Sequence, residues 1–209
     1  MRMCVAIVYT TRRLTGIGRD AIDTTIHLLE LLSPSAVLTT GTAGGLDKDL
    51  STGDAVLAEV MMGEDGKERI SPDKNMFSQA KKVFGSQLLI APIVTVDEPV
   101  CTIKGKAELR ARHGAAACEM ESLYVARVCA ARSLPWVAIR FISDQAQDGL
   151  LDTDHFMFDS TLVRPVLKPC FAEHSREGSR YYDYVDRSHR AAKSIAKIVP
   201  PLINAFIGE

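Results

Sequence analysis

Three carboxylates stand at the ends of apolar segments that have the composition of buried strands. Glu119 and Glu121 follow the run 115–118, and Asp144 comes just after the run 136–142. A charge at such a position costs free energy unless it is paired or used in chemistry, so we expect a site here. Two simpler roles stay open, a helix N-cap at Asp144 and a first-turn carboxylate at Glu121 that the helix dipole favours.

A glycine-rich stretch is the second feature with chemical potential. The apolar run 36–40 predicts a buried strand, and residues 41–45, Gly-Thr-Ala-Gly-Gly, predict a turn at its end. Loops past the carboxyl ends of parallel strands form the ligand crevice of open α/β sheets, where glycine lets backbone amides approach a ligand closely. A tight structural turn needs the same glycines, so both interpretations stay open.

Gly16, Gly18 and Ala21 have the spacing of a dinucleotide-binding fingerprint. In a true fingerprint the first glycine follows the strand at once, and an acidic residue closes the next strand to bind the ribose. Here residues 10–15 intervene, and the next strand ends in threonine. We therefore do not expect NAD binding, and the sequence indicates no other cofactor.

The elements that position these residues form one alternating α/β pattern without an internal repeat or a linker. Strands are predicted at 4–9, 36–40, 55–60, 88–96, 115–118 and 136–142. Helices are predicted at 21–32, 104–113, 120–132 and 187–206, the last one kinked or restarted by Pro200 and Pro201. Residues 63–71 predict a surface loop, and 144–186 predict a loop with one short helix. A strand, a helix and a strand in this order predict a right-handed parallel crossover within a single domain, residues 1–209.

Composition argues against several functional classes. Lys and Arg number 25 against 26 Asp and Glu, a net charge of −1 in 209 residues, so neither nucleic acid nor an anionic membrane is expected as a partner. The longest mainly apolar stretch, 88–96, is about half of a membrane span, and the N-terminus lacks the order of a signal peptide. Five cysteines without a CxxC spacing indicate neither a disulfide framework nor a metal site. We expect reduced thiols and a cytoplasmic protein, with Cys118 and Cys129 as small buried hydrophobic residues.

Three ordered motifs together resemble one family. They are residues 40–46, Thr-Gly-Thr-Ala-Gly-Gly-Leu, followed by Gly53-Asp54; residues 119–122, Glu-Met-Glu-Ser; and residues 139–144, Ile-Arg-Phe-Ile-Ser-Asp. This set is similar to the nucleoside phosphorylase and nucleosidase superfamily, and within it to the 5′-methylthioadenosine/S-adenosylhomocysteine nucleosidases and the hopanoid-associated adenosyl nucleosidases. The resemblance runs from about residue 16 to residue 144 and resumes weakly in the last helix. It implies a three-layer nucleoside phosphorylase-like α/β fold, with a central, mostly parallel mixed sheet flanked by helices.

The resemblance also implies hydrolysis of the N-glycosidic bond of an adenosyl-type purine nucleoside, through a transition state that resembles a ribosyl cation. Asp144 would protonate or hydrogen-bond the purine N7 as general acid, with Ser143 helping to hold it. Glu121 would accept hydrogen bonds from the ribose hydroxyls, with Met120 against the sugar. A carboxylate near the sugar would also stabilise the developing positive charge.

Other positions follow from the same resemblance. Thr42 and Arg140 match positions around the attacking water. The segment 98–100 matches the one whose backbone grips the base. The remaining residues expected to bind substrate are Gly44, Pro99, Val100 and Glu119.

The acceptor of the ribosyl group stays open between water and phosphate. Phosphate is bound by arginine forks and backbone amides. Similar phosphorylases place an arginine where this chain has Thr39, which favours the hydrolase, while Arg12 and Arg13 keep a phosphorylase open. Family members begin with a strand, a glutamate that serves as base for the water, and a hairpin. The strand at 4–9 resembles a later one, so we expect the first strand and its glutamate to be lacking, and a non-catalytic nucleoside-binding or interaction protein is the third alternative.

Similar nucleosidases are dimers, and we expect a homodimer here. Trp136, Phe141, Leu123 and Tyr124 give more apolar surface than a small monomer usually exposes. The helix from Met120 or the glycine stretch is then expected near the interface. The alternative is that these apolar residues fill the core of the monomer.

Overall fold

The computed structural model of the chain describes residues 5–9, 21–149 and 176–208. Its strands are β1 Val5–Tyr9, β2 Ala36–Gly45, β3 Ala55–Gly63, β4 Arg69–Ile70, β5 Leu88–Thr95, β6 Ala117–Glu119 and β7 Trp136–Asp144. Its helices are α1 Ala21–Leu32, α2 Lys74–Phe84, the 3-10 helix η2 Gly85–Gln87, α3 Ile103–His113, α4 Ser122–Ala131 and α5 Arg176–Ile207. Within these residues, no helix is both long and apolar enough to cross a membrane.

Five strands of the mixed sheet pair in a closed ring. β2 pairs with β6 and β7, β3 pairs with β5 and β7, and β5 pairs with β6. The pairs β2–β7, β3–β5 and β5–β6 are parallel, whereas β2–β6 and β3–β7 are antiparallel. β1 joins β2 in parallel, as the predicted crossover requires, and β4 joins β3 outside the ring. Ring closure pairs both edges of the five strands and brings the ends of β2, β6 and β7 together.

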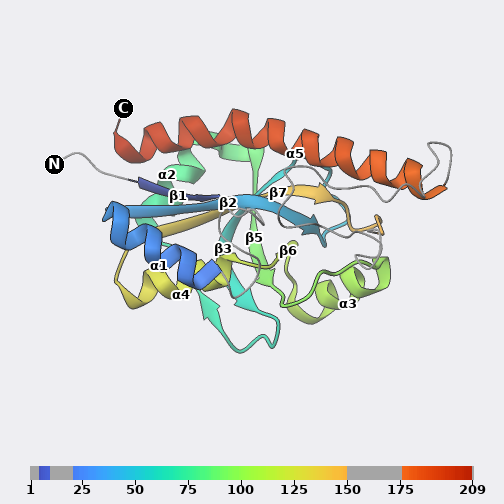
Figure 1. Cartoon of the computed structure of the whole chain (residues 1–209), viewed down its shortest axis with the longest axis horizontal. Helices are drawn as coiled ribbons and strands as arrows, with labels where there is room; N and C mark the ends of the chain where they lie inside the picture. The colour runs from blue at the N-terminus through green and yellow to red at the C-terminus, as the bar shows by residue number, and fades with distance from the viewer. Residues whose placement is uncertain (1–4, 10–20, 150–175, 209) are drawn as a thin grey trace.

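Helices cover both sides of the sheet (Figure 1). Successive side chains of β2 and β7 belong to opposite cores, as the period of two of a strand requires. Val37 and Trp136 pack on the side of α1 and α4, while Leu38 and Val137 pack on the side of α2 and α5. The predicted three-layer α/β fold with a mixed central sheet is confirmed.

The glycine stretch is strand, which corrects the predicted turn. β2 continues to Gly45 because β7 pairs with it as far as Gly44, and β6 pairs with both glycines. A methyl group at Gly44 would lie 3.1 Å from Asp144 Oδ2 and 3.3 Å from Cys118 Sγ. Glycine is therefore needed here for the close approach of three strands rather than for a change of chain direction.

Helix α2 was not predicted, although the sequence contains a local signal for it. Asp73 caps the helix by accepting hydrogen bonds from the backbone amides of Asn75 and Met76, both at 2.9 Å. Met76 and Ala80, four residues apart, are the buried face of the helix. The cap and this spacing together mark a short amphipathic helix between the predicted loop and β5.

Helix α5 is longer than predicted. It begins at Arg176 rather than at 187, and it continues through Pro200 and Pro201, so the predicted restart is wrong. Leu202 and Phe206, which follow the prolines, are buried on the sheet together with residues that precede them. Packing of this apolar face on the sheet holds the helix together where two backbone donors are missing.

The four apolar residues expected at a dimer interface lie in the core of the chain. Trp136, Phe141, Leu123 and Tyr124 are each less than 5% exposed. The alternative interpretation, that they fill the monomer core, is therefore correct. The expected homodimer rests on the family resemblance and not on these side chains.

Candidate active site

Asp144 ends β7, and both oxygens of its carboxylate are held by hydrogen bonds. Ser143 Oγ donates to Oδ1 at 2.7 Å, and Lys106 Nζ donates to Oδ2 at 2.5 Å. Only 5% of the Asp144 side chain is exposed, and Gly44 of β2 packs beside it. Residues 145–149 contain no helix, so the interpretation of Asp144 as a helix cap is wrong. The charge at the end of this buried strand is paired.

Lys106, the partner of Asp144, was not predicted as a site residue. Lys106 lies on α3, is 1% exposed, and also donates to the backbone carbonyls of Gln145 at 2.6 Å and Asp148 at 3.1 Å. The three protons of its ammonium group thus have three acceptors. Burial of this charge would be costly without such partners. The available signal was its position three residues before Leu109, which is buried on the same face of the helix.

A second buried ion pair lies farther back along β7. Arg140 is fully buried; its Nη2 is 2.6 Å from Glu119 Oε2, and its Nε and Nη2 donate to Ser122 Oγ at 2.9 and 2.5 Å. Glu119 Oε2 also accepts from the backbone amides of Glu121 at 3.0 Å and Ser122 at 2.7 Å. Its Oε1 accepts from the Thr95 hydroxyl. Glu119, which was expected to bind substrate, therefore joins β5, β6, β7 and the start of α4.

Glu121 is the more accessible of the two glutamates. It occupies the N-cap position of α4 without a capping hydrogen bond from its side chain. Its Oε2 lies 3.8 Å from Arg140 Nη2, and 14% of its side chain is exposed. Arg140 thus lies between Glu119, both of whose carboxylate oxygens accept hydrogen bonds within the chain, and Glu121, whose side chain is partly exposed. Met120 is half-buried and packs against the buried cluster that includes Leu109 of α3 and Cys118 of β6.

The other predicted positions lie around these two clusters. Thr42 is an exposed residue of β2, two residues before Gly44. Pro99 is exposed and Val100 half-buried, in the segment that leads into α3. The expected base-binding segment therefore directly precedes α3, the helix that carries Lys106, the partner of Asp144.

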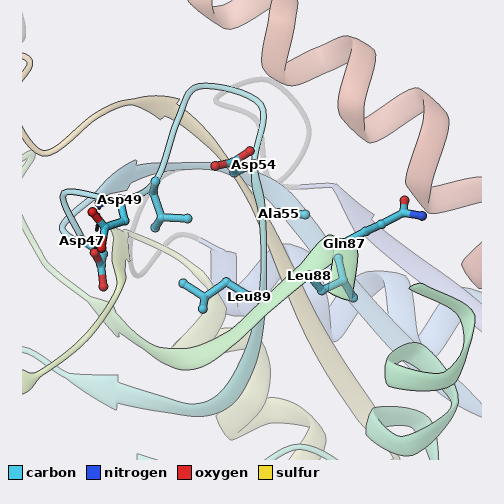
Figure 2. Close-up of a pocket in the computed structure, with 8 residues that line it drawn as sticks. Asp47, Asp49, Asp54, Ala55, Gln87, Leu88 and Leu89 are labelled. Atoms are coloured by element: carbon cyan, nitrogen blue, oxygen red, sulfur yellow. Dashed lines mark hydrogen bonds between the residues drawn. The ribbon is translucent and has the colours of Figure 1, made fainter. Parts of the chain in front are cut away.

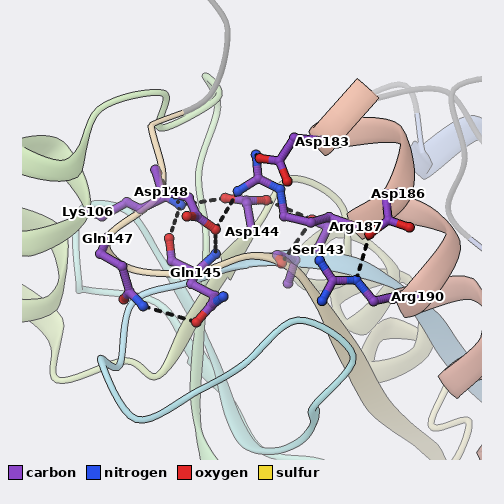
Figure 3. Close-up of polar contacts among 11 residues, drawn as sticks. Lys106, Ser143, Asp144, Gln145, Gln147, Asp148, Asp183, Asp186, Arg187 and Arg190 are labelled. Carbon is purple, nitrogen blue, oxygen red and sulfur yellow. Dashed lines mark hydrogen bonds and ion pairs between the residues drawn. The ribbon is translucent and has the colours of Figure 1, made fainter. Parts of the chain in front are cut away.

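The loop that follows Asp144 is held between two helices (Figure 3). Asp148 Oδ2 accepts from the Gln145 amide at 2.8 Å and lies 2.5 Å from Arg187 Nη1 of α5. Arg187 Nη2 lies 2.8 Å from Asp183 of the same helix. Lys106 of α3 binds two carbonyls of this loop. The position of Asp144 is thus tied to α3 and to α5.

The thiols of Cys118 and Cys129 are poorly suited to nucleophilic chemistry. Burial raises the pKa of Cys118 to about 12, and the nearby Asp144 carboxylate adds to the rise. Burial raises the pKa of Cys129 to about 12 as well. Such thiols stay protonated at neutral pH, in agreement with the prediction that both are small buried hydrophobic residues. Within the described part of the chain, no group of three or more His, Cys, Asp or Glu residues is placed to hold a metal ion.

A cavity of about 410 Å³ lies beside the first residues of β3 and β5 (Figure 2). Asp47, Asp49 and Asp54 contribute to its lining, and none of the predicted site residues does. Asp47 is paired with Arg110 at 2.7 Å, and Asp54 accepts from the Ser51 amide at 2.8 Å. Asp47 and Asp54 have partners within the chain, and no predicted site residue lines the cavity, so the cavity is not assigned to the substrate.

Comparison with known proteins shows the family of the chain. Residues 5–168 match the family model of the phosphorylase superfamily. Over 171 residues the chain is 32% identical to a 5′-methylthioadenosine/S-adenosylhomocysteine nucleosidase of Shewanella piezotolerans, covering 71% of this chain and 74% of the relative. Over 164 residues it is 31% identical to an aminodeoxyfutalosine nucleosidase of Campylobacter jejuni, covering 68% of this chain and 72% of the relative.

Solved structures support the fold. A futalosine hydrolase of Helicobacter pylori superposes with a TM-score of 0.75 at 19% identity and 98% coverage of both chains. A 5′-methylthioadenosine/S-adenosylhomocysteine nucleosidase of Neisseria meningitidis superposes with a TM-score of 0.74 at 21% identity, covering 96% of this chain and 98% of that one. Because the family model spans most of the sequence and the relatives share its fold, the chain belongs to the phosphorylase superfamily.

Proposed function

We propose that this chain is a nucleosidase that hydrolyses the N-glycosidic bond of an adenosyl-type purine nucleoside and releases the free base. The observation that carries the proposal is the buried Asp144 carboxylate, held by Ser143 and Lys106 at the end of β7. The similar relatives are named as nucleosidases, which supports the same reaction class.

In the proposed reaction, the bond between the sugar C1′ and the purine N9 breaks and its electron pair moves to the base. A proton from Asp144 goes to the purine N7, which makes the base a better leaving group. The ribosyl group becomes positively charged, and Glu121 accepts from its hydroxyls and stabilises that charge. Water adds at C1′, with Thr42 nearby, and releases one proton.

Arg140 contributes through the start of α4 in this proposal. Its guanidinium group is in contact with Glu119 and Ser122, and it lies 3.8 Å from Glu121. These contacts fix the turn between β6 and α4, where Met120 and Glu121 would meet the sugar. Preorganised charge of this kind needs no rearrangement at the moment of reaction.

Water rather than phosphate is the proposed acceptor. Thr39, where similar phosphorylases have an arginine, is fully buried in β2, and its hydroxyl has no hydrogen-bond partner. A residue at that depth offers nothing to a phosphate ion. Arg12 and Arg13 lie outside the described residues, so their contribution is tested by experiment.

The test is adenine release from 5′-methylthioadenosine, with and without phosphate. We expect release at the same rate in both, with the free sugar as coproduct. A rate that requires phosphate and yields a sugar phosphate would make the chain a phosphorylase. Binding of the nucleoside without release of adenine would make it a nucleoside-binding protein.

We also propose a substrate type, an oligomeric state and a location for this nucleosidase. The substrate carries an apolar 5′ substituent, which a comparison of 5′-methylthioadenosine with adenosine would test. The protein is a homodimer, for which light scattering should give about twice the 22.8 kDa of one chain. It acts in the cytoplasm, in keeping with free Cys101, Cys118 and Cys129, and fractionation of cells would test this location.

A further inference from the structure

The contacts of Asp144 raise the question of where its proton comes from. Lys106 donates to Oδ2 at 2.5 Å and Ser143 donates to Oδ1 at 2.7 Å, so the carboxylate accepts on both oxygens. A carboxylate in this state has no proton of its own to give to a leaving base. Ser143 Oγ also lies 3.2 Å from the Ala43 carbonyl, and a hydroxyl proton is far too weakly acidic for this task. The acidic proton in contact with Asp144 is that of the Lys106 ammonium group.

The surroundings of the pair separate it from bulk water. Lys106 is 1% exposed and Asp144 is 3% exposed. The other two protons of Lys106 bind the carbonyls of Gln145 and Asp148, in the loop that Arg187 ties to α5. Figure 3 shows Lys106 approaching this loop from one side and Arg187 from the other. The ammonium group is therefore aimed at Asp144 by fixed neighbours.

We propose that Lys106 supplies the proton that Asp144 delivers to the departing purine. This inference rests on the proposed function and adds to it a residue that acts through Asp144. Lys106 is therefore a positioning and proton-supplying residue rather than one that touches the substrate.

The step balances without any further reactant. As the C1′–N9 bond breaks, its electrons move into the purine, and N7 takes a proton from the Asp144 carboxyl. Asp144 takes a proton from Lys106 Nζ across the 2.5 Å contact, which leaves a neutral lysine amine. After the base leaves, the proton released when water adds at C1′ is taken up by Asp144 in the vacated site and passes back to Lys106, which restores the ammonium ion. Lysine can lose a proton in a protein, whereas arginine does not.

Two variants separate the proton from the charge. Lys106→Met keeps an unbranched side chain only one atom shorter and removes both. Lys106→Arg keeps the positive charge and its attraction to Asp144, but its guanidinium group does not lose a proton in proteins. Lys104→Met is the matched control, since Lys104 is on the same helix with 86% of its side chain exposed. Thermal unfolding of all three variants reports whether the fold is kept.

Two leaving groups separate proton supply from structure. Adenine needs a proton to leave, whereas 4-nitrophenolate, placed on the same 5′-methylthio sugar, leaves without one. We expect both Lys106 variants to release adenine about 100- to 10,000-fold more slowly than the unaltered protein, as for loss of general acid catalysis. They should release 4-nitrophenolate within about threefold of its rate, because the sugar site is intact. Lys104→Met should leave both rates unchanged.

Each other outcome has a definite meaning. Equal losses with both leaving groups would make Lys106 a purely structural residue, and full adenine release by Lys106→Arg would make its charge sufficient; either result overturns the proton supply while the nucleosidase stands. If the unaltered protein releases neither group, the proposed function fails, and this inference fails with it.

Discussion

Glu119 and Glu121 are two residues apart, yet the structure gives them different work, and substitution by glutamine should separate them. Glu119→Gln removes the negative charge that faces the fully buried Arg140 at 2.6 Å. Removing one partner of a buried ion pair costs about 3 to 5 kcal/mol, because the other charge stays uncompensated. At about 2 to 4 °C per kcal/mol for a chain of this size, the melting temperature should fall by roughly 6 to 20 °C. Glutamine still offers one oxygen to the amides of Glu121 and Ser122, so we expect the lower half of this range.

Glu121→Gln should behave in the opposite way. Its carboxylate is 3.8 Å from Arg140, beyond hydrogen-bond distance, so stability should fall by less than it does for Glu119→Gln. Adenine release should fall sharply, because a neutral amide does not stabilise a ribosyl cation. Urea unfolding and steady-state rates on both variants decide the matter. A Glu119→Gln protein of unchanged stability but without activity would refute the assignment of Glu119 to the framework, and would return it to the substrate site.

The double variant Glu119→Leu with Arg140→Met should recover part of the lost stability, since an apolar pair can replace a buried ion pair.

Three further predictions use the same assays and chemical labelling. Asp144→Asn should slow adenine release by about 100- to 10,000-fold, and it should also lower the melting temperature, because Lys106 keeps a buried charge without its partner; unchanged stability would mean that the pair is dispensable. Gly44→Ala should cost about 1 to 3 kcal/mol and reduce activity, since its methyl group would lie 3.1 Å from Asp144 Oδ2; a fully active and stable variant would show that the strands can separate without consequence. Cys118, whose pKa burial raises to about 12, should resist iodoacetamide in the folded protein up to about pH 10, whereas the less buried Cys101 should react first, as mass spectrometry of the labelled peptides can determine.

The layers of the fold could be predicted because they depend on local patterns. The apolar run at 88–96 gave β5 within one residue of its end, and the segment 104–113 gave α3 within one residue of its start. The length of β2 could not be predicted in this way. Glycine has a low preference for strands, and Gly41–Gly45 become strand only because β6 and β7 pair with them. That pairing joins residues 72 to 100 positions apart, which no local pattern records.

In the candidate site, too, the residues marked by a local pattern could be predicted, and those that depend on distant contacts could not. Carboxylates at strand ends pointed to Asp144 and Glu119, because charge at the end of an apolar strand is a local anomaly. Lys106 carries no such mark, since a lysine on a polar helix is ordinary, and its burial depends on a partner 38 positions later. For Glu119 the position was informative but the expected role was not, because its hydrogen bonds to Thr95 and Arg140 appear only when three strands meet.

β7 links the two charged clusters, because Arg140 and Asp144 both lie on it. Arg140 and Asp144 are four residues apart in this strand, and its register against β2 shifts by one residue between them. β7 is paired on both sides, with β2 and with β3, and every one of its residues is buried. The strand therefore connects the turn that carries Glu121 with the loop that Lys106 binds, and its pairing on both sides limits movement between them. In the proposed reaction a fixed arrangement matters, because the positive charge on the sugar is stabilised and the base is protonated in one transition state.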